Sequence, residues 1–243
     1  MNIMWFSSGV SSFIAGFLAK DEIDEFIYTH IEDQHPDTLR FLHDCEKILN
    51  RKITIITSDY YRNVEDVCRL HKFIASPRVA KCTEKLKKAV RIKWEYENPG
   101  RHTYFWGLDC LERERKRAER IVEFMPKFDH RFPLIERNLT KEDAHGICQK
   151  LGVKRPVMYE LGYHNNNCVG CLKGGMGYWN KIRIDFPDVF AGRAKLERDI
   201  GHSCLKSIFL DELKPDMGKD ESPITGECGI FCELLMQEQE AGK

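Results

Sequence analysis

The stretch Met4-Trp5-Phe6-Ser7-Ser8-Gly9-Val10-Ser11-Ser12 decides the fold, because it runs from an apolar segment through a hydroxyl-rich turn into a helical pattern. We predict a buried strand over Asn2–Phe6 and a helix over Ser11–Lys20. Backbone N–H groups at the start of a helix, with serine hydroxyls around a glycine, form a cradle for a phosphate or sulfate group. A serine that only caps a helix gives the same pattern, so both interpretations stay open at this point.

The residues that follow alternate between short extended runs and helical patterns. This alternation is the signature of a parallel sheet covered by helices on both faces. We therefore predict an α/β fold with an open, mainly parallel sheet, whose carboxyl edge carries the ligand. Further strands are predicted over Glu25–Ile31, Lys52–Thr57, His102–Trp106 and Phe132–Ile135, and further helices over residues 35–49, 63–93 and 111–124 and from Thr140 onward.

Composition and charge restrict the class of protein. The 243 residues include 38 basic and 38 acidic side chains, so the net charge is zero and binding of nucleic acid through bulk electrostatics is disfavoured. The hydrophobic share of 42% is enough for a folded core. The longest apolar runs are too short for a bilayer, and no basic stretch precedes the first of them. We expect a cytoplasmic protein without a membrane partner.

The sequence changes character after Tyr163. Residues 165–175 form a loop rich in asparagine and glycine, which tolerate left-handed backbone conformations. Residues 214–229 are rich in Gly, Pro, Asp and Ser and are predicted to form a flexible tether. We divide the chain into a nucleotide-binding domain of residues 1–205 and a C-terminal tail of residues 206–243, which contains Cys228 and Cys232.

The chain contains ten cysteines, and several of them are clustered. Without an export signal, reduced thiols that bind metal or take part in catalysis are the default. Two pairs stand out: Cys168 and Cys171 form a C-x-x-C, and Cys228 and Cys232 form a C-x-x-x-C. Four others lie in amphipathic stretches and are predicted to be core residues, namely Cys45, Cys68, Cys110 and Cys148.

The segment Ser7–Ser12 resembles the pyrophosphate loop (S-G-G-x-D-S) of the PP-loop adenine-nucleotide enzymes, and in particular that of the sulfonucleotide reductases, which reduce APS or PAPS. Glu32 and Asp33, followed by Pro36-Asp37-Thr38, are similar to the D-T-G…P-E-T element of these reductases. Gly107, Glu112 and Arg117 are similar to their G…[EQ]…R element. The nucleotide-binding residues that the resemblance implies are Ser7, Ser8, Gly9, Val10, Ser11, Ser12, Glu32, Asp33, Gly107 and Arg117. The implied ligand is ATP or another adenosine nucleotide, with Mg²⁺ as its counter-ion.

The resemblance also implies a metal centre. Cys82, Cys168 and Cys171 resemble three of the four cysteines that hold a [4Fe–4S] cluster in the iron–sulfur APS reductases, and Lys81 stands where the fourth is expected. A three-cysteine site leaves one iron open, as in similar PP-loop enzymes that transfer sulfur. The competing interpretations are a structural zinc site formed by Cys168, Cys171, Cys228 and Cys232, and uncoordinated thiols.

Cys228 is the predicted catalytic residue. Glu227-Cys228-Gly229-Ile230 is similar to the E-C-G-L-H ending that carries the nucleophile of sulfonucleotide reductases, and it implies thiol chemistry with a thioredoxin-like reductant. Two departures bear on this function. Asp109 stands where the reductases have an arginine for the sulfate, and a carboxylate there would repel that group. Arg113 stands where the resemblance to the reductases leads us to expect a serine near that arginine.

Two other functions therefore stay open. One is an ATP pyrophosphatase that adenylates a substrate, such as a tRNA base, before sulfur transfer. The other is a non-catalytic nucleotide-binding protein with a structural zinc site. A homodimer is compatible with each of these functions.

Overall fold

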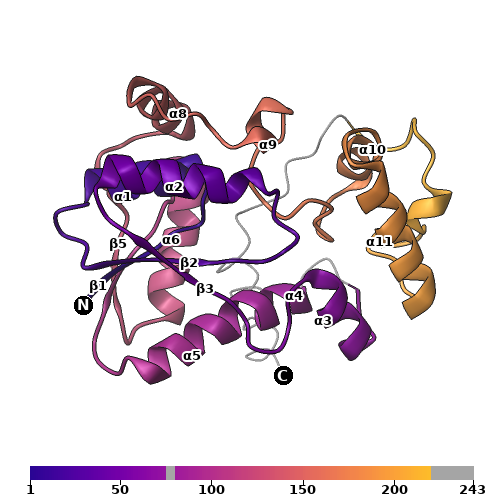
Figure 1. The fold of residues 1–243 in the computed structure, drawn as a ribbon, viewed down its shortest axis with the longest axis horizontal. Helices are drawn as coiled ribbons and strands as arrows, with labels where there is room; N and C mark the ends of the chain where they lie inside the picture. Colours follow the sequence, from indigo (N-terminus) through magenta and orange to yellow (C-terminus); the bar gives the residue numbers. More distant parts are fainter. Residues whose placement is uncertain (75–79, 220–243) are drawn as a thin grey trace. The chain divides into compact units, whose positions relative to one another are not determined.

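Five short strands form a single sheet in the computed structural model, which describes residues 1–74 and 80–219 (Figure 1). The spatial order is β3-β2-β1-β4-β5, and all four neighbouring pairs are parallel. The predicted α/β fold with a parallel sheet is therefore confirmed. The strands are β1 (Asn2–Trp5), β2 (Glu25–Thr29), β3 (Ile53–Ile56), β4 (Thr103–Phe105) and β5 (Asp129–Arg131).

Helices occupy most of the remaining described chain. In the first part they are α1 (Val10–Leu18), α2 (Asp37–Leu49), α3 (Val64–His71), α4 (Lys81–Thr83), the π-helix η1 (Glu84–Lys88), α5 (Ala89–Glu97) and α6 (Glu112–Phe124). They continue as α7 (Pro133–Glu136), α8 (Lys141–Lys150), α9 (Val157–Glu160), α10 (Met176–Asp185), α11 (Pro187–Ile200) and the 3₁₀ helix η2 (Leu210–Glu212). Within the described ranges, no helix has the length and apolar character needed to cross a bilayer.

The fifth strand lies earlier in the chain than the sequence suggested. The prediction of a strand over Phe132–Ile135 is wrong, because Asp129–Arg131 forms β5 and Pro133–Glu136 forms α7. Pro133 stands at the start of the helix, where a missing N–H costs nothing, whereas in a sheet it would break the ladder. Leu134 is fully buried, so the apolar run contributes to the core as part of a helix.

Side chains are buried on both faces of the sheet. Met4 and Phe105 point to one face and join a core that includes residues of α1, α2 and α8. Strand alternation sends Trp5 and Tyr104 to the opposite face. There the Trp5 ring packs edge-on against Trp94 of α5, with the ring centroids 5.6 Å apart. Burial on both faces explains why the central strands are almost continuously apolar.

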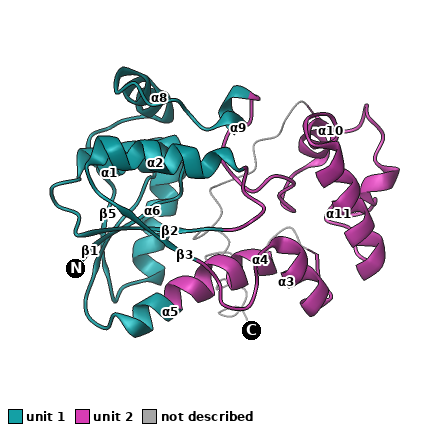
Figure 2. Ribbon diagram, viewed as in Figure 1, with its two compact units in different colours: residues 1–30, 36–56, 93–160 teal, residues 31–35, 57–92, 161–243 magenta. Residues whose placement is uncertain are grey.

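The chain divides into two compact units (Figure 2). The first comprises residues 1–30, 36–56 and 93–160 and contains the whole sheet. The second comprises residues 31–35, 57–92 and 161 onward, with α3, α4, α10 and α11. The boundary at residue 205 between a nucleotide-binding domain and a tail stays a prediction.

The predicted tether over residues 214–229 is wrong for its first part. The Asn180 side-chain amide donates to the carbonyl oxygens of Lys214 (3.0 Å) and Met217 (2.7 Å). The chain is thus fixed against α10 in this part, because one amide group satisfies two carbonyls that a free tether would leave to water. Residues 220–229 lie outside the described residues.

Candidate functional site

The strand order places a topological switch point between β1 and β4. Strand β1 has β2 on one side and β4 on the other, so the connections that follow β1 and β4 diverge from the carboxyl edge of the sheet. In open α/β sheets, ligands bind at this point. The predicted phosphate loop Ser7–Ser12 follows β1, and Gly107 follows β4. The fold therefore brings these two predicted elements to one edge.

Gly107 and Ser12 are in direct contact. A Cβ atom added to Gly107 would lie 2.5 Å from the Cα and 2.7 Å from the backbone nitrogen of Ser12. Both are backbone atoms, so a side-chain rotation could not relieve the overlap. A glycine is therefore required where the β4 loop crosses the start of α1, and the predicted contact of Gly107 with a nucleotide stays a prediction.

The predicted phosphate loop folds on itself through its serines. The N–H of Ser7 donates to the hydroxyl of Ser12 (3.0 Å), and the hydroxyl of Ser8 donates to the carbonyl of Ser7 (2.7 Å). Ser8 takes a left-handed backbone conformation, with φ of 56°. The Ser7 hydroxyl is buried and finds no hydrogen-bond partner within the described residues. A buried hydroxyl without a partner is costly, and an anion bound in the loop would satisfy it.

The start of α1 has a glycine in place of a capping side chain. Its N-cap is Gly9, and none of the described side chains caps the first turn. The N–H of Val10 points toward the Tyr159 hydroxyl at 3.4 Å, and Ser11 and Ser12 in the first turn are buried. The positive end of the helix dipole favours a negative group at such a terminus.

Tyr159 is a neighbour of this loop that sequence reasoning missed. It lies on α9, whose position is fixed by Asp37 at the start of α2: the Asp37 carboxylate accepts the N–H of Val157 (2.8 Å) and binds Arg40 (2.7 Å). Arg40 in turn donates to the carbonyl of Lys154 (2.7 Å). No motif links residue 159 to residue 10, so only the fold reveals this contact.

Asp109 and Arg117 are both buried in the segment after β4. Arg117 forms an ion pair with Glu114 one turn earlier on α6. The Asp109 carboxylate accepts the N–H of Leu111 at 3.0 Å and so stabilises the start of α6. Burial raises the pKa of Asp109, because it disfavours the charged form of the carboxylate.

Glu32 and Asp33 belong to the second unit, and Asp33 has a structural role there. Its carboxylate pairs with Arg193 of α11 and accepts the N–H of Val64 at 2.6 Å. Its carbonyl accepts the N–H of Val169 at 2.8 Å. Glu32 is exposed. Asp33 thus holds in place the loop that carries Cys168 and Cys171. The predicted position of Glu32 or Asp33 beside a nucleoside stays a prediction.

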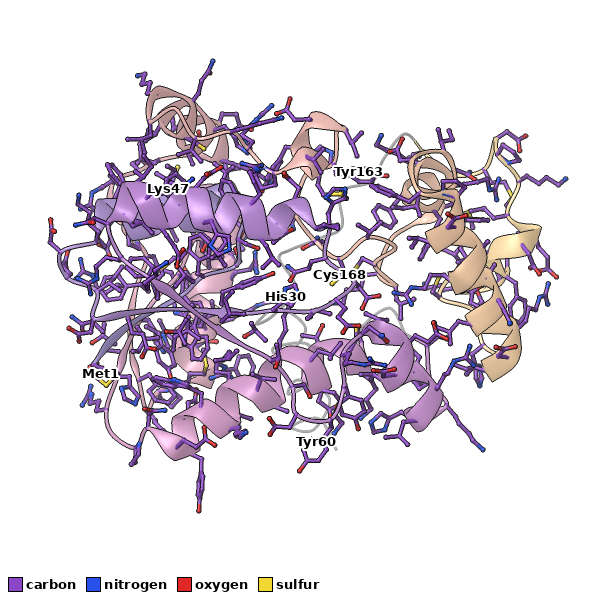
Figure 3. All side chains as sticks on the ribbon, viewed as in Figure 1. Met1, His30, Lys47, Tyr60, Tyr163 and Cys168 are labelled. Carbon is purple, nitrogen blue, oxygen red and sulfur yellow. The ribbon has the colours of Figure 1, made fainter. Side chains whose placement is uncertain are left out.

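The C-x-x-C loop is tightly packed. Cys168 and Cys171 are 6% and 8% exposed, and Gly170 between them has a φ of 68°. The Tyr178 hydroxyl accepts the N–H of Cys171 (2.9 Å) and donates to the carbonyl of Cys168 (3.4 Å). Tyr178 and Trp179 are buried, so they anchor the loop to the core. Figure 3 shows the labelled Cys168 on this loop.

The predicted metal ligands are only partly described. Cys82 is half-buried at the start of the helical segment α4, while Cys228 and Cys232 lie outside the described residues. Across residues 1–74 and 80–219, no three His, Cys, Asp or Glu side chains are arranged to hold a metal ion. The described residues therefore do not fit an iron–sulfur cluster or a zinc ion by themselves, and we derive no step through a metal.

The remaining cysteines are mostly core residues. Cys45, Cys68 and Cys148 are buried, as predicted, and Cys110 is half-buried. Burial raises the pKa of Cys68 and of Cys148 to about 11, so these thiols are poor nucleophiles at neutral pH. Cys204, which no motif singled out, is half-buried and lies beside Glu197.

Comparison with known proteins agrees with the resemblance. The family model described as the phosphoadenosine phosphosulfate reductase domain matches residues 1–174. A solved structure of phosphoadenylyl-sulfate (PAPS) reductase from Candida auris, in a phosphate complex, is similar at 13% identity with a TM-score of 0.47. That similarity covers 66% of this chain and 78% of the other. No protein of curated function matches the chain.

Proposed function

Because the chain belongs to the phosphoadenosine phosphosulfate reductase domain family, we propose that it is an enzyme that reduces a sulfonucleotide through thiol chemistry. The observation that carries this proposal is the phosphate loop at the switch point. Three features support an anion site here: no described side chain caps the start of α1, the buried Ser7 hydroxyl has no partner among the described residues, and Gly107 packs closely on Ser12.

In this proposal, the backbone N–H groups at the start of α1 and the hydroxyls of Ser7–Ser12 bind a phosphate group of an adenosine nucleotide. The site needs no large rearrangement, because the Ser7–Ser12 hydrogen bond already fixes the turn. Preorganised donors contribute more to affinity than donors that must be ordered on binding.

The chemical step belongs to Cys228. Its thiolate attacks the sulfur of the sulfonucleotide, a sulfur–sulfur bond forms, and the bond from sulfur to the phosphate oxygen breaks. The nucleotide leaves with the electron pair of that bond, and Cys228 carries a thiosulfonate. A second thiol then attacks the sulfur of Cys228, which releases sulfite and leaves a disulfide for a thioredoxin-like reductant to reduce.

Asp109 favours a second candidate function. It stands where a sulfate-binding arginine is expected, so this position carries an acidic side chain in place of a basic one. An ATP pyrophosphatase would use the same phosphate loop with Mg²⁺–ATP and would not need a sulfate site. In that case pyrophosphate, and not sulfite, would be the product.

Calorimetric titration with 3′-phosphoadenosine 5′-phosphosulfate and with ATP tests the binding site. Ser7→Ala should weaken binding about 10-fold to 100-fold, the loss of one hydrogen bond to a charged group. Ser207→Ala, at an exposed serine, is the matched control and should bind like the wild type. Equal affinities of the two variants would contradict the assignment of the loop.

A further inference from the structure

Lys141 stands in the first turn of α8, where the helix itself has no use for a positive charge. The start of α8 is already capped by the reciprocal hydrogen bonds of Thr140 and Asp143, at 3.1 Å and 2.9 Å. The positive end of a helix dipole disfavours a cation in the first turn. Lys150, in the last turn of α8, complements the dipole instead. The stability of α8 therefore does not account for a lysine at residue 141.

The start of α8 lies beside the segment that follows β4. The N–H of Cys110 donates to the carbonyl of Leu139 at 2.9 Å, so the chain that enters α8 runs past Asp109. Burial raises the pKa of Asp109, and the positive charge of Lys141 acts on this pKa in the opposite direction. Asp109 itself stands where a sulfate-binding arginine is expected. A cation is thus present beside this position, although it comes from a different element.

Tyr159 connects Lys141 to the start of α1. The Lys141 ammonium lies over the Tyr159 ring, 5.7 Å from its centroid, a distance at which the ring face attracts a cation. The hydroxyl of the same ring lies 3.4 Å from the backbone nitrogen of Val10, the first residue of α1. All three residues belong to the first compact unit. One aromatic side chain therefore contacts both the ammonium and the helix start that carries the predicted phosphate loop.

His145 lies against the same ring and does not supply this charge. Its imidazole packs edge-on against Tyr159, with the ring centroids 4.8 Å apart. Burial, with the charges of Arg155 and Lys141, lowers the pKa of His145 to about 4. The imidazole is therefore neutral at pH 7, and the cation over the Tyr159 ring is Lys141.

We propose that Lys141 binds the anionic group attached to the α-phosphate of the nucleotide, which is the sulfonate of a sulfonucleotide or the β-phosphate of an adenosine polyphosphate. The inference rests on the proposed function, because it requires an adenosine nucleotide with its phosphate on Ser7–Ser12. Lys141 then neutralises the group beyond that phosphate. Because it takes the place of the cation that is missing at residue 109, an acidic side chain there is compatible with an anionic ligand.

A lysine is suited to this role. Its charge lies at the end of a flexible four-carbon stem, so the half-buried Lys141 side chain can direct its ammonium to an oxygen atom of the anion without a movement of α8. The Tyr159 ring restricts the stem, which reduces the conformational entropy that is lost on binding.

Calorimetric titration with pairs of nucleotides that differ by one anionic group tests the proposal. 3′-Phosphoadenosine 5′-phosphosulfate is paired with adenosine 3′,5′-bisphosphate, which lacks the SO₃ group, and ADP is paired with AMP, which lacks the β-phosphate. Lys141→Met keeps an apolar stem and removes the charge. It should weaken binding of the longer ligand about 10-fold to 100-fold and leave the shorter ligand unchanged. A loss confined to the first pair identifies the sulfonate, and a loss confined to the second identifies the β-phosphate.

The melting temperature separates this role from a structural one. Because the lysine opposes the dipole of α8, Lys141→Met should raise the melting temperature by about 1–4 °C while it weakens binding. Lys141→Arg keeps the charge and should retain the preference for the longer ligand. Lys150→Met, at the exposed end of α8, is the matched control and should bind all four nucleotides like the wild type.

The other outcomes distinguish this inference from the proposed function. If Lys141→Met binds every nucleotide like the wild type while Ser7→Ala binds more weakly, the role of Lys141 is overturned and the proposed function stands. An equal loss for both members of each pair would also overturn it, since Lys141 would then act on the shared part of the ligands or on the fold. A wild type that binds none of the four nucleotides would overturn the proposed function itself.

Discussion

Replacement of Gly107 by alanine should damage the nucleotide site more than the fold. The new Cβ atom would lie 2.5 Å from the Ser12 Cα and 2.7 Å from the Ser12 nitrogen, so the first turn of α1 must move. Overpacking of this kind costs about 1–3 kcal/mol in unfolding free energy. A misaligned Ser12 N–H loses a hydrogen bond to a charged phosphate, worth about 1.5–3 kcal/mol, or roughly 10-fold to 100-fold in Kd.

Gly146→Ala is the matched control for this prediction. Gly146 lies inside α8, and within the described part of the chain no atom lies within 4 Å of an added Cβ atom. Alanine there should raise stability by about 0.5–1 kcal/mol through helix propensity and leave nucleotide affinity unchanged. The assays are calorimetric titration with an adenosine nucleotide and denaturant unfolding of each variant. Equal Kd values for Gly107→Ala and the wild type would refute the phosphate-loop assignment.

Three further variants test other parts of the account. Burial, with the nearby charges of Arg155 and Lys141, lowers the pKa of His145 from 6.5 to about 4. Stability should therefore be complete above pH 6.5 and fall by up to roughly 3 kcal/mol as the pH drops toward 4. His145→Phe should remove this loss in denaturant titrations at pH 7 and 4.5, and equal losses in both proteins would count against it. Asp109→Asn keeps the acceptor for the Leu111 N–H and removes a carboxylate whose pKa burial raises. Its melting temperature should exceed that of the wild type at pH 7 but match it at pH 3, where Asp109 is protonated; a difference at pH 3 would contradict this reasoning. Cys228→Ser should abolish sulfite formation and leave nucleotide affinity unchanged, whereas a joint loss of metal and melting temperature would assign Cys228 to a metal site.

The sheet and the strand–turn–helix arrangement around Ser7–Ser12 were predictable from the sequence, because each depends on local patterns. Apolar runs separated by helical periods specify parallel strands, and Ser7–Ser12 follows the first of them. The predicted start of α8 was also confirmed: Thr140 accepts the N–H of Asp143 (3.1 Å), and the Asp143 carboxylate accepts the N–H of Thr140 (2.9 Å). The prediction of β5 failed because an apolar run of four residues fits a strand and a buried helix equally well.

The contacts that the sequence could not reveal join distant residues. Asp33 pairs with Arg193, 160 residues later, and Tyr159 reaches Val10, 149 residues earlier. The fixed position of residues 214–218 was hidden for a different reason. Their Gly- and Pro-rich composition is typical of a tether. They are held, however, through their own backbone carbonyl groups, which accept from the Asn180 side chain, and backbone carbonyls are present in every sequence.

The product of turnover tests the central claim most directly. Reduced protein is incubated in parallel with 3′-phosphoadenosine 5′-phosphosulfate plus a dithiol and with Mg²⁺–ATP, and sulfite and pyrophosphate are measured in both reactions. A thiol-dependent sulfonucleotide reductase should release sulfite in the first reaction and no pyrophosphate in the second. Pyrophosphate release from ATP without sulfite from the sulfonucleotide would contradict the account and identify the chain as an ATP pyrophosphatase.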